Sequence, residues 1–315
     1  MDKPTDNALL LVNYHYVRER AQYPHPGIHP IEPDEFMRQL SWLKSSFHMA
    51  SPEEVEAFAH GARSLPAKSV FLTFDDGLVD HIEVARKYLN PLKVRAAFFV
   101  CSRPILDKKA IMVHKTHWLR ATTKPEDFAR DFANLLPEKW KSLTDQSSTA
   151  REALETYVYD TPEDARIKYL INFQLPAEVV DAVTSEMLAA RGIADEKFCR
   201  DLYMDDGQVN ELAQDGHIVG SHGHTHTPFA RLDEDELGRE IETNLSCIEG
   251  ITRRRPTWVS YPYGSPWAIP DNAGAFCRRF GFSIGITLKR GWNDGSQPPW
   301  SLNRINTNEV STIAA

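Results

Sequence analysis

Short apolar runs alternate with amphipathic stretches in the first third and the last third of the chain. Each run ends in polar or turn-forming residues, which is typical of strands that are buried on both faces of a parallel sheet. We therefore expect strands at Leu9–Tyr16, Lys68–Phe74, Ala96–Val100, His217–His222, Trp258–Tyr261, Phe282–Thr287 and Ser301–Ile305.

Helical spacing of apolar residues separates these predicted strands. Helices are expected to begin near Pro33 and after Ser51, a capping residue followed by acids, and to cover Leu78–Leu89, Asp206–Gln214 and Asp233–Leu245. Strands that alternate with helices predict a parallel α/β fold, either a barrel or a doubly wound sheet. In both folds the active site lies at the C-terminal ends of the strands.

The middle of the chain has a different texture. Between about 102 and 199, Lys, Glu, Asp and Ala dominate, and apolar residues such as Phe128, Phe132 and Leu135 recur at helical spacing. We predict one catalytic domain spanning 1–315, interrupted at about 102–199 by a mainly helical insertion.

Charge and cysteine content limit the function further. The 315 residues carry a formal net charge of −8, which argues against a nucleic-acid partner. No stretch approaches the length of a membrane span or the apolar core of a signal peptide, so we expect no stable membrane insertion and a cytoplasmic location. A homo-oligomer remains open. No cysteine pair has metal-site spacing, and all four are expected to be reduced thiols: Cys101, Cys199, Cys247 and Cys277.

Two polar clusters follow predicted strands. The run that ends at Phe74 leads directly into Asp75, Asp76 and Gly77, and adjacent carboxylates repel unless a cation or a proton lies between them. Far downstream, the strand after His217 leads into a histidine-rich run, His222 to His226. Alone, the first cluster could be a turn or a helix cap and the second a solvated loop. Because both end apolar strands, they favour one metal site.

The histidine spacing suits a catalytic metal. His222 and His226 are four residues apart, and on a helical or coiled turn both imidazoles would lie on the same side. With one aspartate they form a three-ligand set that leaves a position open, as in catalytic zinc sites. The other aspartate could then act as general base. Spacing alone leaves the division of roles between Asp75 and Asp76 open.

These residues resemble the polysaccharide deacetylases of carbohydrate esterase family four, which contain the NodB-homology domain. Thr73 to Gly77 is similar to the first motif of that family, His222 to His226 to its second, and Tyr261 to Gly264 to its third. Ser301 to Ile305 resembles a late Leu-x-Arg-Ile segment. The resemblance covers about 9–100 and 206–305. It implies a deformed (β/α) barrel.

The resemblance also implies a reaction and a division of roles. Asp75 would be the catalytic base, Asp76, His222 and His226 would bind a divalent metal, with zinc favoured, and the backbone N–H of Tyr263 would stabilise the oxyanion. The implied activity is hydrolysis of a carbon–nitrogen bond other than a peptide bond, removing an N-acyl group, usually acetyl, from an amino sugar or oligosaccharide. The segment Tyr14 to Arg18 and the insertion resemble deacetylase-like proteins of surface-polysaccharide or glycoconjugate metabolism.

Several positions depart from the family pattern. Gly223 replaces a Ser or Thr that normally supports the second motif, and Ser260 stands where an Arg normally orients the base. Arg304 is the candidate substitute for that Arg. The usual C-terminal histidine, the proton donor, is absent, and His15 is the best candidate to lie in the active site instead. We expect structural or supporting roles for His81 and His224.

Two alternatives remain open at this stage. The chain could be a non-catalytic sugar-binding protein on a degenerate deacetylase fold, or it could hydrolyse a non-sugar amide. Aromatic residues near the motifs would suit sugar stacking, although aromatic side chains more often belong to the core: Trp258, Tyr261, Tyr263, Trp267 and Trp292.

Overall fold

The computed structural model describes residues 7–19, 30–144, 150–156 and 161–313. These residues form two compact units. The first contains every strand, and the second, which begins at Lys108 and ends at Cys199, is helical. The helical unit thus covers 108–199, where the sequence predicted an insertion at about 102–199. The helix α4 (Arg103–Leu106) belongs to the first unit, where Arg103 N–H donates to the His224 carbonyl over 3.0 Å.

The first unit is built on a parallel sheet. The strands of the described part are β1 (Leu9–Tyr14), β2 (His48–Met49), β3 (Ser69–Phe74), β4 (Ala97–Val100), β5 (Ile218–Ser221), β6 (Trp258–Ser260), β7 (Ile284–Ile286) and β8 (Ile305–Asn306). Their order is β7-β6-β5-β4-β3-β1-β8, and β2 pairs separately with β3. Every pair is parallel, which confirms the α/β prediction. The sequence missed β2, because two residues carry no periodicity.

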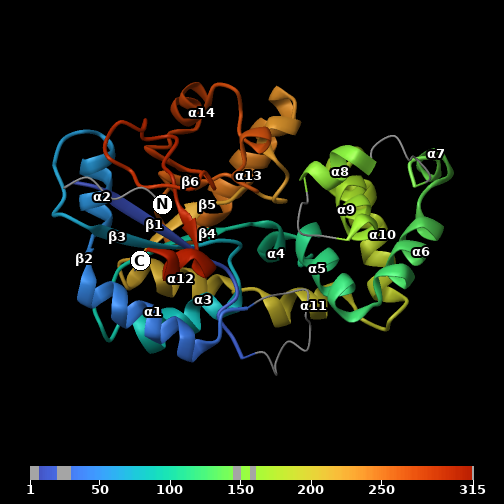
Figure 1. The fold of residues 1–315 in the computed structure, drawn as a ribbon, viewed down its shortest axis with the longest axis horizontal. Coiled ribbons are helices and arrows are strands. Elements are labelled where there is room, and N and C mark those ends of the chain that lie inside the picture. Colours follow the sequence, from blue (N-terminus) through green and yellow to red (C-terminus); the bar gives the residue numbers. More distant parts are fainter. Residues whose placement is uncertain (1–6, 20–29, 145–149, 157–160, 314–315) are drawn as a thin grey trace. The chain divides into compact units, whose positions relative to one another are not determined.

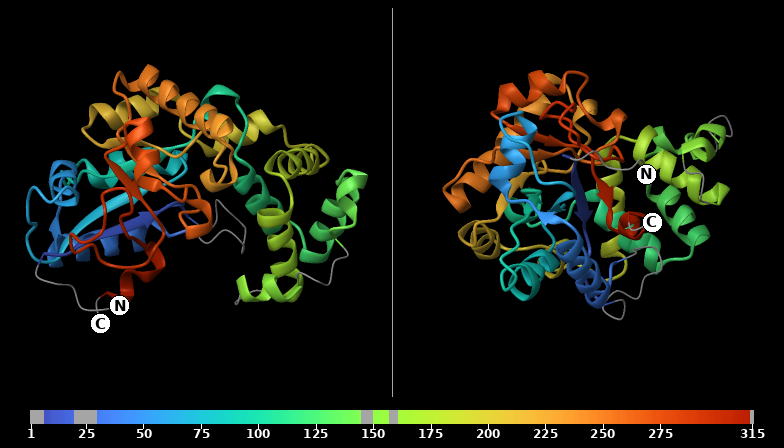
Figure 2. Two further views of the ribbon diagram at one scale, coloured as in Figure 1. Left: turned by 90° about the horizontal axis from the view of Figure 1, so that it is seen from above. Right: turned by 60° about the vertical axis from the view of Figure 1, so that its left-hand side comes forward.

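The segment that follows Trp300 bends the sheet into a deformed barrel. Leu302 forms a parallel bridge with Ile286 at the β7 edge, and Ile305 pairs with Val12 of β1. One short stretch therefore contacts strands from opposite ends of the sheet order. Figure 2 shows β1 in dark blue beside the red segment that contains β8.

Helices surround these strands. In Figure 1, α1, α3 and α12 lie along one side of the strands and α14 on the other, while α13 packs against α12. Capping boxes at Ser51, Asp205 and Asp233 fix the starts of α2, α12 and α13. The helical elements of this unit are α1 (Pro33–Ser46), α2 (Pro52–Ala59), α3 (Val79–Val84), the π-helix η2 (Ala85–Leu89), α4, α12 (Asp206–Gln214), α13 (Glu234–Thr252), α14 (Ala273–Phe280), and the 3₁₀ turns η5 (Phe229–Arg231), η6 (Pro266–Ala268) and η7 (Thr307–Thr312).

Side chains alternate between the two faces of each strand. In β1, Leu10 and Val12 pack in the same cluster as residues of α1, whereas Leu9 and Leu11 join Trp258 in the other cluster, inside the barrel. Further along the strands this inward face becomes polar, through Asn13, Thr73, Asp75 and Ser260, all buried. Buried polar groups must pair with one another. The barrel interior therefore has an apolar end and a polar end.

The second unit is a helical cluster with its own apolar core. Leu119, Phe128 and Phe132 pack there against Val183 and Met187. No helix in the described part of either unit is both long and apolar enough to cross a membrane. The elements are α5 (Met112–Thr122), α6 (Pro125–Leu135), α7 (Glu138–Lys141), α8 (Ala150–Thr156), α9 (Pro162–Tyr169), the π-helix η4 (Leu170–Gln174), α10 (Ala177–Ala189) and α11 (Asp195–Leu202), which extends past the boundary at Cys199.

Candidate metal centre and active site

Three side chains converge where β3 and β5 end. One ligand atom from each of Asp76, His222 and His226 lies within 4.8 Å of the others. Asp76 Oδ1 is 3.3 Å from His222 Nε2 and 3.5 Å from His226 Nε2. The structure thus brings together the three residues that the sequence proposed as ligands. We call them the Asp/His cluster.

The Asp/His cluster fits a divalent cation. His222 Nδ1 donates to the Ser260 carbonyl over 2.6 Å, which leaves the lone pair of the neutral ring on Nε2, the atom that faces Asp76. Such a second hydrogen bond is the usual way in which proteins orient a metal-binding imidazole. One carboxylate and two imidazoles form the ligand set of a catalytic zinc site with an open position.

Unfavourable backbone conformations gather at this point. Asp76, His226 and Tyr263 have positive φ angles of 83°, 66° and 62°. Each such residue costs on the order of 1–3 kcal/mol, and strain of this kind concentrates at functional sites. The two imidazoles are brought together by this backbone, with ring centroids 4.8 Å apart. Of the helical or coiled turn that the sequence left open, the structure has the non-helical one, because residues 222–228 form a loop.

The loop that carries the histidines is supported from α13. Glu240 accepts hydrogen bonds from Thr225 N–H and Oγ1, over 2.7 and 3.0 Å, and Asn244 Nδ2 donates to the Gly223 carbonyl over 2.7 Å. A Cβ atom on Gly223 would lie 2.8 Å from Glu240 Oε1, so Ser or Thr at this position would displace the Glu240 carboxylate that supports the loop. Burial raises the pKa of Glu240. The sequence missed both supporting residues, because an acid and an amide within a helix are ordinary features.

Asp75 lies next to the Asp/His cluster, on the inward face of β3. Its Oδ2 accepts from Arg304 Nη2 over 2.6 Å and from Ser260 Oγ over 3.1 Å. Burial alone would raise the pKa of Asp75, but the Arg304 guanidinium, helped by His222, outweighs it and holds the pKa at about 2. Asp75 is therefore ionised. Its Oδ1 is buried and has no hydrogen-bond partner within the part of the chain that the structure describes.

Arg304 supplies the guanidinium next to Asp75 that an arginine at position 260 supplies in the family pattern. Its side chain is 1% exposed, and besides Asp75 it donates to Asn13 Oδ1 and Ser260 Oγ, each over 3.0 Å. The closing segment of the barrel delivers this guanidinium to the polar end of the interior. Residues from β1, β3, β6 and the segment beside β8 thus form one buried network.

His15 lies on the other side of Asp76. Its Nε2 is 3.9 Å from Asp76 Oδ2, and its side chain is 40% exposed. His81, at the start of α3, donates from Nε2 to the His15 carbonyl over 3.1 Å. Burial lowers the pKa of His81 to about 3, so this supporting ring is neutral. The proposed proton donor is therefore close to the cluster and reachable from solvent.

A second contact fixes the same segment. Asp80 Oδ2 accepts from Val17 N–H over 2.9 Å and from Arg18 Nε over 2.6 Å, and Arg18 Nη2 also binds Asp80 Oδ1. Both side chains are nearly buried. The sequence missed Asp80, because one acid in the first turn of a helix is an ordinary feature.

The remaining candidates divide between the site and its surroundings. The Tyr263 ring packs on His226 with centroids 4.9 Å apart, so Tyr263 borders the cluster. His224 is not a member of it: its Nδ1 is 3.0 Å from Ser102 Oγ and its Nε2 3.4 Å from Asp107. His224 therefore ties the loop to α4.

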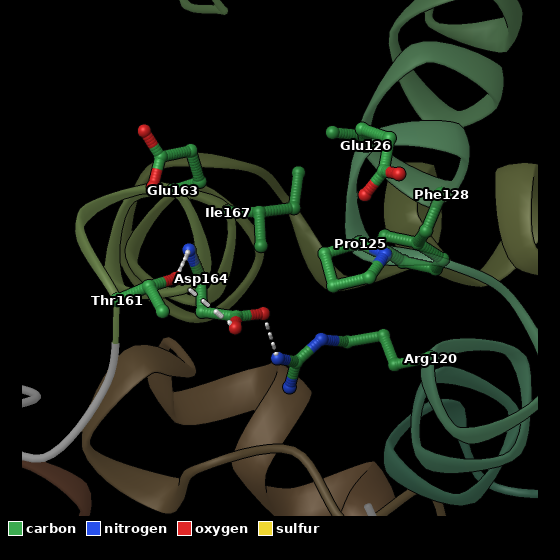
Figure 3. Close-up of a pocket in the computed structure, with 9 residues that line it drawn as sticks. Arg120, Pro125, Glu126, Phe128, Thr161, Glu163, Asp164 and Ile167 are labelled. Atoms are coloured by element: carbon green, nitrogen blue, oxygen red, sulfur yellow. Dashed lines mark hydrogen bonds and ion pairs between the residues drawn. The ribbon is translucent and has the colours of Figure 1, made fainter.

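The helical unit contains a pocket of about 360 Å³. Figure 3 shows that Ile167 and Pro125 border it and that the Arg120 guanidinium extends toward Asp164, to which it is hydrogen-bonded over 2.6 Å. Thr161 caps the helix that carries Asp164. Because the guanidinium is already neutralised by a carboxylate, this pocket offers less chemistry than the Asp/His cluster.

Comparison with known families identifies the class of protein. The family model for polysaccharide deacetylase matches residues 62–130 and 181–284, which is more than half of the chain. The chain therefore belongs to the polysaccharide deacetylase family, whose members are hydrolases that act on carbon–nitrogen bonds other than peptide bonds. The matched segments include Asp75, Asp76, His222, His226 and Tyr263.

Solved structures support the same fold. The deacetylase PplD of Streptococcus pyogenes, solved with acetate, is 16% identical with a TM-score of 0.56, covering 96% of this chain and 93% of that one. IcaB of Ammonifex degensii is 17% identical with a TM-score of 0.56, covering 98% and 96%. The BpsB deacetylase domain of Bordetella bronchiseptica is 16% identical with a TM-score of 0.53, covering 97% and 98%. At these identities the likeness establishes the deformed (β/α) barrel.

A curated relative matches over a shorter stretch. The peptidoglycan-N-acetylglucosamine deacetylase of Bacillus cereus is 27% identical over 70 residues, which is 20% of this chain. The match spans about a quarter, 26%, of that relative's length.

Proposed function

We propose that this chain is a metal-dependent hydrolase that removes an N-acyl group, in the first instance acetyl, from an amino sugar within a polysaccharide or oligosaccharide. One observation carries the proposal. An ionised, buried carboxylate, Asp75, has Oδ2 fixed by Arg304, while its Oδ1 has no hydrogen-bond partner among the described residues, and Asp75 lies beside the three-residue Asp/His cluster, with Oδ2 4.0 Å from His222 Nε2. Family membership and the named activity of the Bacillus cereus relative point to the same chemistry.

Asp76, His222 and His226 would hold the metal, and the mixed imidazole and carboxylate ligands make zinc the proposed ion. When bound, such an ion acidifies water and polarises an acyl carbonyl. The protein's part is to present three pre-oriented ligand atoms. The hydrogen bond from His222 to the Ser260 carbonyl and the support of the loop by Glu240 serve that purpose.

Asp75 is proposed as the general base. Its bare Oδ1 accepts a proton from the attacking water, while Arg304 and Ser260 hold Oδ2 and fix the orientation of the carboxylate. The backbone N–H of Tyr263 is proposed to donate to the oxygen of the acyl group as negative charge develops there. One such preorganised donor contributes about 3 kcal/mol in comparable sites.

His15 is proposed as the proton donor to the leaving nitrogen. It is half exposed and close to Asp76, and its backbone is held by His81 and, through Val17, by Asp80. A positioned general acid contributes typically 10²–10⁴-fold. Asp80 and His81 act here as positioning residues.

The test measures metal content and acetate released from an N-acetylglucosamine tetramer. We expect Asp75→Asn to keep the metal and lose at least about 10²-fold in rate, because it removes the proposed base and leaves the three proposed ligands in place. His222→Gln should lose both metal and activity. Glu211→Gln, which alters an exposed ion pair with Arg86 on η2, is the control and should match the wild type.

Equal acetate release by the wild type and Asp75→Asn would overturn the assignment of the base. A wild type that binds the sugar and the metal but releases no acetate would overturn the hydrolase proposal and favour the non-catalytic alternative.

A further inference from the structure

Trp267 stands out among the aromatic residues near the motifs. Its side chain is 37% exposed, whereas Trp258 and Tyr261 are buried in the core. Its ring packs on Tyr263 with centroids 5.4 Å apart, and Tyr263 packs in turn on His226. A continuous aromatic row therefore leads from a ligand of the Asp/His cluster to the surface of the same unit.

The turn that presents this row is rigid. Tyr263 and the following Gly264 both have positive φ angles, 62° and 56°, and a Cβ atom on Gly264 would lie 2.6 Å from the backbone nitrogen of Leu288. Only glycine fits there. Pro266 then opens the short helix η6, which holds Trp267. A side chain presented in this way loses little conformational entropy when it binds a ligand.

Arg231 completes the surface. Its guanidinium lies over the Trp267 ring, 5.3 Å from the centroid, and it comes from η5, the first element after the histidine loop. The indole offers an apolar face and the guanidinium offers hydrogen-bond donors. A pyranose ring has the matching character, with an apolar C–H face and hydroxyl groups around its edge.

We propose that Trp267 and Arg231 form a subsite for a pyranose ring next to the sugar whose N-acyl group is hydrolysed. The inference rests on the proposed function and specifies its substrate as an oligomer. The position of Trp267 carries the argument. Of the other large apolar side chains that are exposed in the described residues, Leu106 lies on α4 and Leu154 on α8, and neither belongs to the row that reaches the cluster.

The kinetic test compares an N-acetylglucosamine monomer with its tetramer. We expect Trp267→Ala to raise the KM for the tetramer about 10-fold more than the KM for the monomer, because stacking contributes roughly 1.4 kcal/mol and only the oligomer reaches the subsite. Trp267→Phe should restore most of the loss. Arg231→Lys keeps the cation over the ring and should be milder than Arg231→Met. Leu106→Ala is the control for removal of an exposed apolar side chain.

A binding measurement keeps the inference separate from catalysis. In the Asp75→Asn background, calorimetry with the tetramer should give an affinity about 10-fold weaker when Trp267→Ala is added, with unchanged metal content and thermal unfolding. Equal affinities would overturn the subsite even if the enzyme is a deacetylase. Conversely, a wild type that releases no acetate but binds the tetramer through Trp267 would refute the proposed function and support the subsite.

Discussion

Two buried cations, one in each unit, show how the same interaction serves different ends. Arg304 in the barrel is 1% exposed and Lys115 in the helical unit is 0% exposed. Each lies 2.6 Å from a carboxylate oxygen, of Asp75 and Asp181 respectively. A charge removed from water without a partner costs several kcal/mol, so each cation requires its carboxylate.

The carboxylates differ more than the cations. Asp75 is 2% exposed, its Oδ2 lies 4.0 Å from His222 Nε2 of the Asp/His cluster, and its Oδ1 has no hydrogen-bond partner in the part of the chain that the structure describes. Lys115 is shared between Asp181 and Asp195, which are 18% and 21% exposed, and it also donates to Ser185 Oγ over 2.7 Å. These contacts join α5, α10 and α11. A buried ion pair therefore indicates chemistry when it leaves a polar atom available next to other reactive groups, and indicates architecture when its members tie elements together.

Removing the barrel cation should have the largest effect. We expect Arg304→Met to lower the free energy of unfolding by about 3–5 kcal/mol, because Asp75 would be left buried and unpaired. Adding Asp75→Asn should recover about half of that loss or more, since the unpaired charge is then gone. Urea unfolding of the four proteins in this cycle measures both values.

The matched control is Arg86→Met. Arg86 binds Glu211 with two hydrogen bonds, but both side chains are more than a third exposed, 43% and 35%. Exposed pairs contribute little to stability because water screens them, so Arg86→Met should leave the free energy of unfolding nearly unchanged. If Arg86→Met and Arg304→Met destabilise the chain equally, burial is not the cause of the difference.

Protonation of His217, a histidine that is buried in its neutral form, should have the next largest effect on stability. His217 Nδ1 accepts from Ala96 N–H over 3.2 Å, and Nε2 donates to Asn90 Oδ1 over 2.9 Å. Burial lowers the pKa of His217 from 6.5 to about 4. Because the folded pKa lies below the unfolded one, the neutral ring stabilises the fold fully above pH 6.5. That stability, up to about 3 kcal/mol, is lost as the pH falls toward 4.

Urea unfolding of the wild type and His217→Asn at pH 7.5 and pH 4.5 measures this contribution. The advantage of the wild type should shrink by most of those 3 kcal/mol at the lower pH. An advantage of the same size at both values would show that His217 does not titrate with a lowered pKa.

The smallest effect is expected in the helical unit. Lys115→Met should lower stability by about 1–3 kcal/mol, less than Arg304→Met, because water reaches Asp181 and Asp195 and screens their unpaired charge. Hydrogen exchange should quicken in α5, α10 and α11 and stay unchanged in β1 and β3. Faster exchange in the strands as well would contradict the assignment of Lys115 to local architecture.

Much of the barrel could be predicted from the sequence because its signals are local. Apolar runs that end in Asp75, His222 and Tyr263 marked strand ends, and parallel strands place such ends together. Because position 260 is a serine and not the arginine of the family pattern, the sequence also pointed to Arg304 as the substitute. The structure places Arg304 2.6 Å from Asp75.

The residues that support the site could not be predicted, because their roles depend on tertiary contacts that no local sequence pattern encodes. Glu240 and Asn244 support the histidine loop from α13, and Asp80 holds the segment of His15, but each looks like an ordinary helical residue. The positive φ angles of Asp76 and His226 could not be predicted from the sequence either, because neither residue type requires them.

The closing segment of the barrel has a consequence for biosynthesis. Arg304 binds Asn13, a residue 291 positions earlier, and supplies the positive charge that Asp75 needs. A ribosome must therefore complete nearly the whole barrel before Asp75 meets its counter-charge. A nascent chain that still holds residue 304 inside the ribosome lacks the buried network around Asp75, so the hydrolysis that we propose can begin only after translation has passed this point.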